Sequence, residues 1–317
     1  MHAPSDIPRT GVSPEAEAWL AANPPRPRTE ITPHNADRVR AVTRLGWAPA
    51  MAAVRDEFPA VVERSIEVGG VDCLEVSAGS SGTADGASDE KTVLYFFGGG
   101  HTVGSPEEDI VISAPLAAIA GVRVIAPRYP LAPEHPYPAA VDAAEAVYRE
   151  LLASLDPTRL VIAGESAGGN LALALFLRAR AAGLAMPAAF ALLSPWGDLG
   201  HRGDSHATNR DPSLVSTDGD LDDMALLYRR DHSVDDPMIS PVHADFTGLP
   251  PTFMTTGTRD LLLSDAVRLD TGMRADGVDV TLRVWEGMWH VFEFFREFPE
   301  ARASMAEVAA WVAAQLA

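Results

Sequence analysis

One tight turn constrains the fold of this chain more than any other feature. The apolar run 160–163 leads into Gly-Glu-Ser-Ala-Gly at 164–168, and an apolar, helix-forming segment follows over 170–180. Strand, Gly-x-Ser-x-Gly and helix in this order are typical of a nucleophile elbow, which presents a serine hydroxyl at a helix N-terminus. Glycine or alanine is needed beside the serine, because the strand and the helix approach each other closely at this turn. The alternative is an ordinary glycine-rich loop, but the flanking pattern favours Ser166 as a nucleophile.

Apolar strands alternate with helices in the rest of the chain after residue 60. A hairpin is predicted around Gly69-Gly70. The predicted strands are 61–68, 71–78, 92–97, 122–126, 159–163, 188–193, 252–256 and 278–284. This alternation predicts an α/β fold whose mostly parallel sheet is covered by helices on both faces, with ligands at the carboxyl ends of the strands.

Two segments do not fit the alternating pattern. Residues 1–59 contain helical patches at 14–22, 36–45 and 49–58 and no strand signal, and residues 197–236 are polar with a helical stretch near 220–230. We therefore expect an α/β core formed by residues 60–196 and 237–317, with residues 1–59 as a helical appendage and residues 197–236 as an insertion. Trp47, Trp196 and Tyr228 are candidate walls of a pocket, and simple packing is the alternative for each.

Composition excludes several classes of function. The chain has 317 residues, is 47% hydrophobic and carries a net charge of -19, which argues against nucleic acid and anionic membranes as partners. Cys73 is the only cysteine, so an intrachain disulfide and a cysteine-built metal site are excluded. The first residues lack the regions of a signal peptide, and no apolar run is long enough to span a bilayer. These features predict a soluble cytoplasmic protein.

A serine nucleophile needs a base, and the base needs an orienting acid. In sheets of this type the chain order is serine, acid, histidine. Of the three histidines that lie well downstream after a strand or loop, His232 falls in the insertion and His243 precedes the strand expected to carry the acid. His290 follows the strand 278–284 and a turn, so it should lie at a strand's carboxyl end. We therefore predict His290 as the base.

The acid is expected directly after the strand 252–256. Asp260 stands there, whereas its competitor Asp265 falls within the next predicted helix. An oxyanion hole would need backbone N–H groups, and two sources fit: Ala167, next to the nucleophile, and the glycine run 98–100. A phosphate-binding loop is the rival interpretation of that run, but the required spacing fails at Val103 and no Gly-Lys-Ser/Thr follows.

Together these stretches resemble the hormone-sensitive-lipase-like (family IV) carboxylesterases of the α/β-hydrolase superfamily. Among the matching stretches are Tyr-Phe-Phe-Gly-Gly-Gly-His at 95–101 and Arg-Tyr-Pro-Leu-Ala-Pro-Glu-His at 128–135. The others are 164–170, 194–196, 211–215, 249–252, 260–265 and 290–292. Within the branch, residues 240–265 and 288–292 look most similar to monoterpene ε-lactone hydrolase-type esterases.

The resemblance implies an eight-stranded sheet and a cap made of the N-terminal helices and the insertion. It also implies a triad of Ser166, His290 and Asp260 and an oxyanion hole formed by Gly99, Gly100 and Ala167. It is compatible with a homodimer, and it gives no reason to expect a metal or organic cofactor. The expected activity is hydrolysis of short- to medium-chain acyl esters through an acyl-enzyme, with a small-molecule ester as substrate.

The sequence departs from the family pattern at two points. Phe97 precedes the glycine run where the family usually has a histidine that holds the loop, and His101 follows it where an aromatic residue is usual. Glu165 stands where the family more often has aspartate or threonine. Glu165 could orient a neighbouring loop or form an ion pair, and a structural role is favoured.

Two other functions fit the same residues less well. A lactonase or a natural-product deacetylase would use the same triad, and rates on a lactone, an amide and an ester would distinguish them. A non-catalytic ligand receptor on this fold is the more remote alternative, because relatives of that kind lack the catalytic histidine and this chain has His290.

Overall fold

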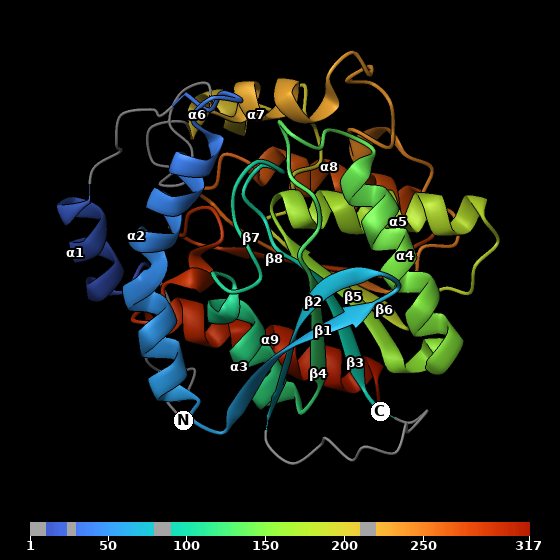
Figure 1. Ribbon diagram of the computed structural model, residues 1–317. Helices are drawn as coiled ribbons and strands as arrows, with labels where there is room; N and C mark the ends of the chain where they lie inside the picture. Colours follow the sequence, from blue (N-terminus) through green and yellow to red (C-terminus); the bar gives the residue numbers. More distant parts are fainter. Residues whose placement is uncertain (1–10, 24–29, 79–89, 210–219) are drawn as a thin grey trace.

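Eight strands form one twisted sheet, which organises the molecule (Figure 1). The computed structural model describes residues 11–23, 30–78, 90–209 and 220–317. The strand order is β1-β2-β4-β3-β5-β6-β7-β8. The strands are β1 (Val61–Val68), β2 (Val71–Ala78), β3 (Thr92–Phe96), β4 (Arg123–Pro127), β5 (Leu160–Glu165), β6 (Ala189–Leu193), β7 (Thr252–Gly257) and β8 (Val280–Trp285). Pairing is antiparallel between β1 and β2 and between β2 and β4, and parallel elsewhere. The predicted fold class is confirmed.

Helices cover both faces of the sheet (Figure 1). On one face α3 packs against α9, and on the other α4 packs against α5. The helices that follow strands are α3 (Ile110–Ala120), α4 (Ala139–Ser154), α5 (Ala167–Ala181), α8 (Leu263–Ala275) and α9 (Pro299–Gln315). Short helical turns occur at η2 (Pro157–Arg159), α6 (Ser205–Thr208), η3 (Pro241–His243) and η4 (Phe292–Phe294).

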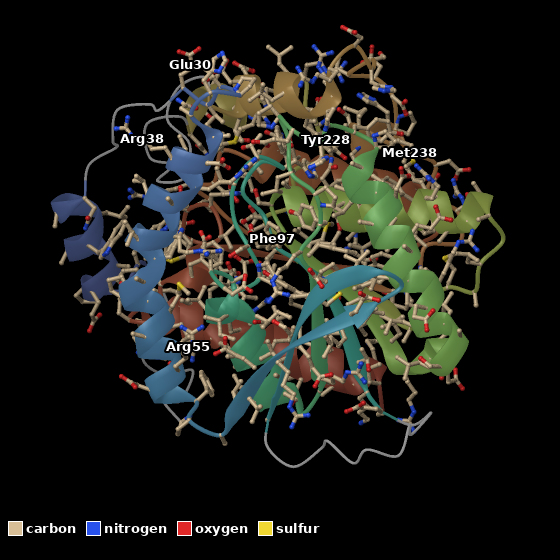
Figure 2. All side chains as sticks on the ribbon, in the orientation of Figure 1. Glu30, Arg38, Arg55, Phe97, Tyr228 and Met238 are labelled. Carbon is tan, nitrogen blue, oxygen red and sulfur yellow. The ribbon has the colours of Figure 1, made fainter. Side chains whose placement is uncertain are left out.

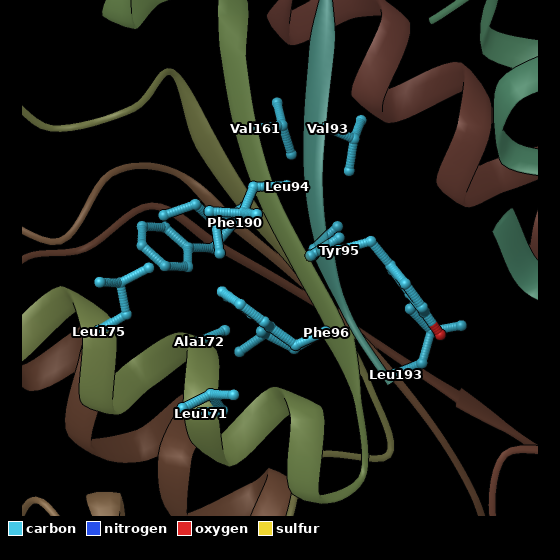
Figure 3. Packing of buried hydrophobic residues seen from close by; sticks show 14 of the residues in the cluster. Val93, Leu94, Tyr95, Phe96, Val161, Leu171, Ala172, Leu175, Phe190 and Leu193 are labelled. Carbon is cyan, nitrogen blue, oxygen red and sulfur yellow. The ribbon is translucent and has the colours of Figure 1, made fainter. Parts of the chain in front are cut away.

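The central strands are buried on both faces, as expected for parallel strands between helical layers. Every residue of β3, β5, β6 and β7 is buried. In Figure 3, Leu171 and Leu175 of α5 lie beside Phe96 and Phe190 of the sheet. Full burial of one such side chain contributes about 1.5–3 kcal/mol. This rigid base fixes the positions of the turns at the carboxyl ends of its strands.

Three helices lie apart from the sheet layers: α1 (Pro14–Ala22), α2 (Ala36–Glu57) and α7 (Asp220–Arg229). The two patches predicted at 36–45 and 49–58 are one helix, which runs through Pro49. An interior proline costs about 3 kcal/mol because it removes a hydrogen bond and crowds the preceding turn. Packing of Val54, which is 1% exposed, and of half-buried Met51 against the core offsets this cost.

The remaining sequence predictions can be placed on this fold. Most predicted strands and helices begin and end within about two residues of the observed ones. Residues 211–215, one of the stretches that carry the family resemblance, lie outside the described residues. None of the helices in the described ranges is both apolar enough and long enough to pass through a bilayer.

Candidate active site

Ser166 occupies the turn between β5 and α5 in a backbone conformation with positive φ that is rare for residues other than glycine, with φ 53° and ψ -118°. Its N–H donates to the carbonyl oxygen of Leu193 on β6, at 2.9 Å. A Cβ at position 168 would overlap the carbonyl oxygen of Phe96, so only glycine lets α5 start this close to the sheet. The strained turn is thus held by neighbouring strands and presents the serine side chain at the N-terminus of α5.

The side chains of His290 and Asp260 complete a hydrogen-bonded chain with Ser166. His290 Nε2 lies 2.9 Å from Ser166 Oγ, and His290 Nδ1 lies 3.0 Å from Asp260 Oδ1. Ser166 is 5% exposed to solvent, His290 is 2% exposed and Asp260 is 0% exposed. Three residues that are remote along the chain therefore meet within hydrogen-bonding distance in a region shielded from water.

Asp260 is held by groups on its own turn. Its Oδ2 accepts the Thr256 hydroxyl at 3.1 Å, and its Oδ1 accepts the N–H of Leu262 at 2.8 Å. Burial alone would raise the pKa of this carboxyl, but the charge of His290 and the hydrogen bonds from His290 and Leu262 lower the pKa below its ordinary value. Asp260 is therefore an ionised partner that fixes the orientation of the imidazole.

Asp265, the competing acid, takes part in a different network. Its carboxylate accepts the N–H groups of Gly197 and Asp198 at 3.0 Å each, and it lies 3.0 Å from His206 Nε2. It ties the segment after β6 to α8. The structure brings Asp260, and not Asp265, to His290.

The glycine run 98–100 lies beside Ser166 and lines the same cavity. Gly99 and Gly100 have positive φ values of 95° and 61°. The carbonyl oxygen of Gly99 accepts the N–H groups of Thr102 and Val103 at 3.0 Å, which closes the loop into a tight turn. Among the described residues, no acceptor pairs with the N–H of Gly99 or Gly100. These two donors are available to a ligand in the cavity.

Phe97 is buried in the interior of the molecule (Figure 2). Its ring stacks on Tyr129 with centroids 4.1 Å apart, and the Tyr129 hydroxyl donates to the Phe97 carbonyl oxygen at 2.6 Å. Stacking and this backbone contact hold the start of the loop where the family usually has a histidine.

His101, at the other end of the run, does not replace that histidine through hydrogen bonds. Neither of its ring nitrogens has a partner within the described part of the chain. The His101 ring stacks on the ring of Tyr228 of α7, with the two centroids 3.8 Å apart. The ring of Trp196 also stacks with His101, with a distance of 6.2 Å between centroids. Burial lowers the pKa of His101 to about 3, so it is neutral at physiological pH. His101 supports the loop as an aromatic ring.

A cavity of about 810 Å³ opens above Ser166 and His290. Its lining includes residues of α1, α2 and α7, the glycine run and the segment after His290. Aromatic lining side chains are Trp19, Trp47, Phe294 and Phe295. Of the candidate pocket walls, Trp47 lines this cavity and contacts Phe294 with ring centroids 5.0 Å apart.

The prediction that Trp196 and Tyr228 are pocket walls is wrong for this cavity. Both are 0% exposed and neither belongs to its lining. Both stack with His101, so their rings fill the space behind the glycine run. They support the loop, which Tyr228 reaches from α7 (Figure 2).

Sequence reasoning did not single out several groups around the site. Ser194, directly after β6, accepts the N–H of Val291 at 3.2 Å and so holds the residue after the histidine. Glu293 is fully buried and accepts the hydroxyls of Thr255 and Ser304 at 2.7 Å each. The one available signal was position, since Ser194 ends a predicted strand. In the described ranges, no cluster of three or more His, Cys, Asp or Glu side chains is arranged to hold a metal ion.

Comparison with known proteins defines the class to which this fold and site belong. Residues 93–294 match the model of a protein family that is described as having the alpha/beta hydrolase fold. The chain belongs to this family, within its hormone-sensitive-lipase-like branch of carboxylic ester hydrolases.

Individual relatives support that placement. An esterase of Acinetobacter venetianus is 34% identical over 282 residues, covering 86% of this chain and 91% of the relative. An acetyl-hydrolase of Streptomyces hygroscopicus is 38% identical over 219 residues, covering 68% and 73%. The solved structure of EstE5 superimposes with a TM-score of 0.86 at 31% identity, covering 96% of this chain and 99% of that one. An esterase of the bacterial hormone-sensitive lipase family gives a TM-score of 0.83 at 32% identity, with the same coverage.

Proposed function

We propose that the protein is a serine carboxylesterase in which Ser166, His290 and Asp260 are the catalytic residues. The observation that carries the proposal is the continuous chain of hydrogen-bonding distances from Ser166 Oγ through the imidazole to Asp260, buried at the base of a cavity. His290 is the base that makes the serine hydroxyl nucleophilic, and Asp260 orients its ring.

The reaction proceeds through an acyl-enzyme. His290 Nε2 takes the proton of Ser166 Oγ as the oxygen attacks the ester carbonyl carbon. The resulting alkoxide is stabilised by the N–H groups of Gly99, Gly100 and Ala167, and loss of one of these donors should raise the barrier by about 3–4 kcal/mol. His290 then passes the proton to the leaving alcohol, and a water molecule repeats the steps on the acyl group.

The cap is proposed to consist of residues 1–59 and 197–236, over a core of 60–196 and 237–317. The support is the lining of the cavity, to which α1, α2 and α7 contribute alongside the core turns. A bounded cavity of about 810 Å³ favours acyl groups of short to medium length. An acyl-chain series from acetate to dodecanoate, with the optimum expected at or below octanoate, measures this.

The central test is Ser166→Ala on p-nitrophenyl acetate and butyrate. We expect kcat to fall by about 10⁶, as for loss of a catalytic serine elsewhere, and His290→Ala to fall similarly, with little further loss in the double variant. A fluorophosphonate probe should label the native protein and not Ser166→Ala. Turnover retained in Ser166→Ala would remove Ser166 from its role, and a native protein that is neither labelled nor active would revive the ligand-receptor alternative.

The same machinery serves lactones and acetylated natural products. The Streptomyces relative is an acetyl-hydrolase, which favours a small acyl group among these alternatives. Rates on an ε-lactone, an N-acetyl amide and a simple ester of the same size distinguish the three. We expect the simple ester to be fastest.

Further properties follow from charge and resemblance. A net charge of -19 supports the absence of a nucleic-acid partner. A homodimer and a cytoplasmic location remain predictions, tested by light scattering on the purified protein and by cell fractionation.

A further inference from the structure

The carboxyl group of Glu165 connects the nucleophile turn to the glycine run. Glu165 is the last residue of β5 and is 3% exposed. One of its oxygens accepts the N–H of Gly98. Since β3 and β5 are paired up to Phe96 and Gly164, this side chain extends the link between the two strands beyond the end of their ladder.

The absence of a side chain at Gly98 leaves room for the Glu165 carboxyl group. A Cβ at position 98 would overlap the Glu165 carboxyl oxygens, so any residue but glycine would displace the side chain. A peptide unit is planar, so fixing the Gly98 N–H fixes the orientation of the plane from which the loop departs. Glycine residues restrict the backbone dihedral angles only weakly, so they do little to fix the orientation of the next peptide planes. The hydrogen bond at Gly98 is therefore more important for the directions of the next two N–H groups.

In the part of the chain that the structure describes, no acceptor other than Glu165 holds an N–H group of the glycine run. Of the three donors at 98–100, Gly98 alone is paired with a protein acceptor within the described residues, and Glu165 is that acceptor. Tyr129 holds the other end of the same peptide unit, since its hydroxyl donates to the Phe97 carbonyl oxygen, and His101 stacks beneath α7. Glu165 thus supplies, on the N–H side of this peptide unit, a hydrogen bond that the Phe97 side chain cannot provide.

The surroundings of Glu165 favour its neutral form. The ionisable groups near it are Asp109, Glu293, Tyr95 and Tyr129, all of them acids. Burial raises the pKa of Glu165 well above its ordinary value, and the charges of Asp109 and Glu293 raise it further against the opposing hydrogen bond from Gly98. A neutral carboxyl still offers a carbonyl oxygen to Gly98, so the contact does not depend on charge.

We propose that Glu165 is a positioning residue for the hydrolysis, which aims the N–H groups of Gly99 and Gly100 by holding the N–H of Gly98. This inference rests on the proposed function of the site. It assigns a specific role to the residue before the nucleophile: the oxyanion site on one loop is set by a side chain from the neighbouring strand.

Three substitutions separate the acceptor from the charge. Glu165→Gln keeps an oxygen acceptor in the same place on a group that cannot ionise, Glu165→Met keeps the volume without an acceptor, and Glu165→Asp keeps an ionisable carboxyl but withdraws the acceptor by one methylene. Loss of one oxyanion donor costs about 10²–10³ in kcat, and misaiming should cost part of that. We expect kcat on p-nitrophenyl butyrate within about threefold of native for Gln and about 10- to 100-fold lower for Met, with KM changed less than about threefold in both.

Affinity for a trifluoromethyl ketone is the readout that a merely structural role would not move. Its hemiketal oxygen occupies the oxyanion site, so Ki should rise in Glu165→Met by the same factor by which kcat/KM falls. If Glu165→Met fails to fold, the order of the other two decides. Positioning requires Gln to be more active than Asp, whereas a role for the negative charge requires the reverse and overturns the proposal. Native kcat and Ki in Glu165→Met overturn it as well.

Glu300 supplies a matched control. It is another buried glutamate whose carboxylate accepts a backbone N–H, that of Ser13 at 2.7 Å, and it lies outside the cavity lining. Glu300→Met should lower the melting temperature and leave the ketone Ki at its native value. Ser166→Ala in the same series separates the two proposals: a native protein without Ser166-dependent turnover refutes the esterase, whereas an active native protein with equal Gln, Asp and Met variants refutes only the role of Glu165.

Discussion

The floor and the roof of the cavity are built in different ways. The floor consists of the turns after β3, β5, β7 and β8, which carry the glycine run, Ser166, Asp260 and His290. Its polar groups are almost completely buried and are linked by hydrogen bonds of 2.8–3.1 Å. The roof consists of α1, α2 and α7, whose lining side chains include half-buried Trp47 and Val42, which is 62% exposed. Apolar and aromatic contacts predominate there.

This difference assigns the catalytic reaction to the floor and the selection of substrates to the roof. Directional hydrogen bonds on a rigid sheet fix atoms to within the tolerance that proton transfer demands. Aromatic and apolar contacts are less directional, so a roof built from them can admit several substrates at modest cost. Changes in the floor should therefore act on kcat, and changes in the roof on KM and chain-length preference.

One roof element also supports the floor. On α7, Tyr228 stacks on His101, and a Cβ at position 100 would overlap Met224. The helix therefore closes the space above the glycine run as well as lining the cavity. The division between floor and roof is incomplete for α2 as well, because Arg40 of α2 donates to the carbonyl oxygen of Thr102 at 2.9 Å, just after the glycine run.

Asp260→Asn is expected to give the largest effect of the remaining tests, a loss of about 10³–10⁴ in kcat. The amide cannot stabilise the imidazolium, and its NH₂ group would favour the wrong tautomer of His290. Stopped-flow acylation with p-nitrophenyl acetate measures the step directly.

Asp265→Asn is the matched control for that variant. Asp265 is also a buried aspartate that accepts two hydrogen bonds from backbone N–H groups, but it ties Gly197 and Asp198 to α8. We expect it to lower the melting temperature and keep most of kcat. A larger kcat loss in Asp265→Asn than in Asp260→Asn would mean that the acid has been assigned to the wrong residue.

Trp47→Ala tests the roof and should have an intermediate effect. Trp47 lines the cavity, and loss of its contact with a bound substrate, taken as about 0.5–1.5 kcal/mol, corresponds to a rise of about 2- to 13-fold in KM. We expect kcat to change less than about twofold, because no atom of the triad moves. Steady-state kinetics across the acyl series measures both constants.

Trp311→Ala provides the comparison outside the roof. Trp311 on α9 pairs with Phe253 of the sheet at 5.5 Å, so its loss should reduce stability without altering KM. A drop in kcat with unchanged KM in Trp47→Ala would contradict the separation of roof from floor.

Much of the floor was predictable because its signals are local. Apolar strands, the glycines of the elbow and the order of Ser166, Asp260 and His290 along the chain are all properties of short segments. Each catalytic candidate follows a strand, and parallel strands bring their carboxyl ends to one edge. The fold prediction was therefore confirmed, and the three side chains were expected near one another.

The errors lie where the direction of a side chain depends on distant packing. Nothing near Trp196 or Tyr228 in the sequence shows that both rings turn toward His101 and away from the cavity. The contact of Glu165 with Gly98 joins residues 67 positions apart, and the partners of Glu293 come from β7 and α9. Pro49 predicted a break in α2 because propensity carries no information about the packing of Val54 and Met51 that sustains the helix.

The smallest expected effect is on the pH dependence of the free energy of unfolding, and it also differs between the floor and the roof. Asp109 lines the floor of the cavity, is 5% exposed and accepts the Tyr95 hydroxyl at 2.8 Å. Burial raises the pKa of Asp109 to about 8, against about 3.9 in an unfolded chain. Between these two values the folded protein binds a proton that the unfolded chain has lost. The free energy of unfolding therefore falls as the pH rises through this window.

Asp109→Asn removes that titration and leaves a carbonyl oxygen for Tyr95. We expect its melting temperature, measured by calorimetry from pH 5 to pH 9, to gain on the native protein as the pH rises and to level off above about pH 8. Part of the native slope should persist, because burial raises the pKa of Glu165 and Glu293 in the same direction. Asp37→Asn on α2 is the roof control: its carboxylate is 95% exposed, so its curve should run parallel to the native one. Parallel curves for Asp109→Asn would instead place the buried proton on another floor carboxyl, and the remaining slope in Glu165→Gln and Glu293→Gln would identify which one.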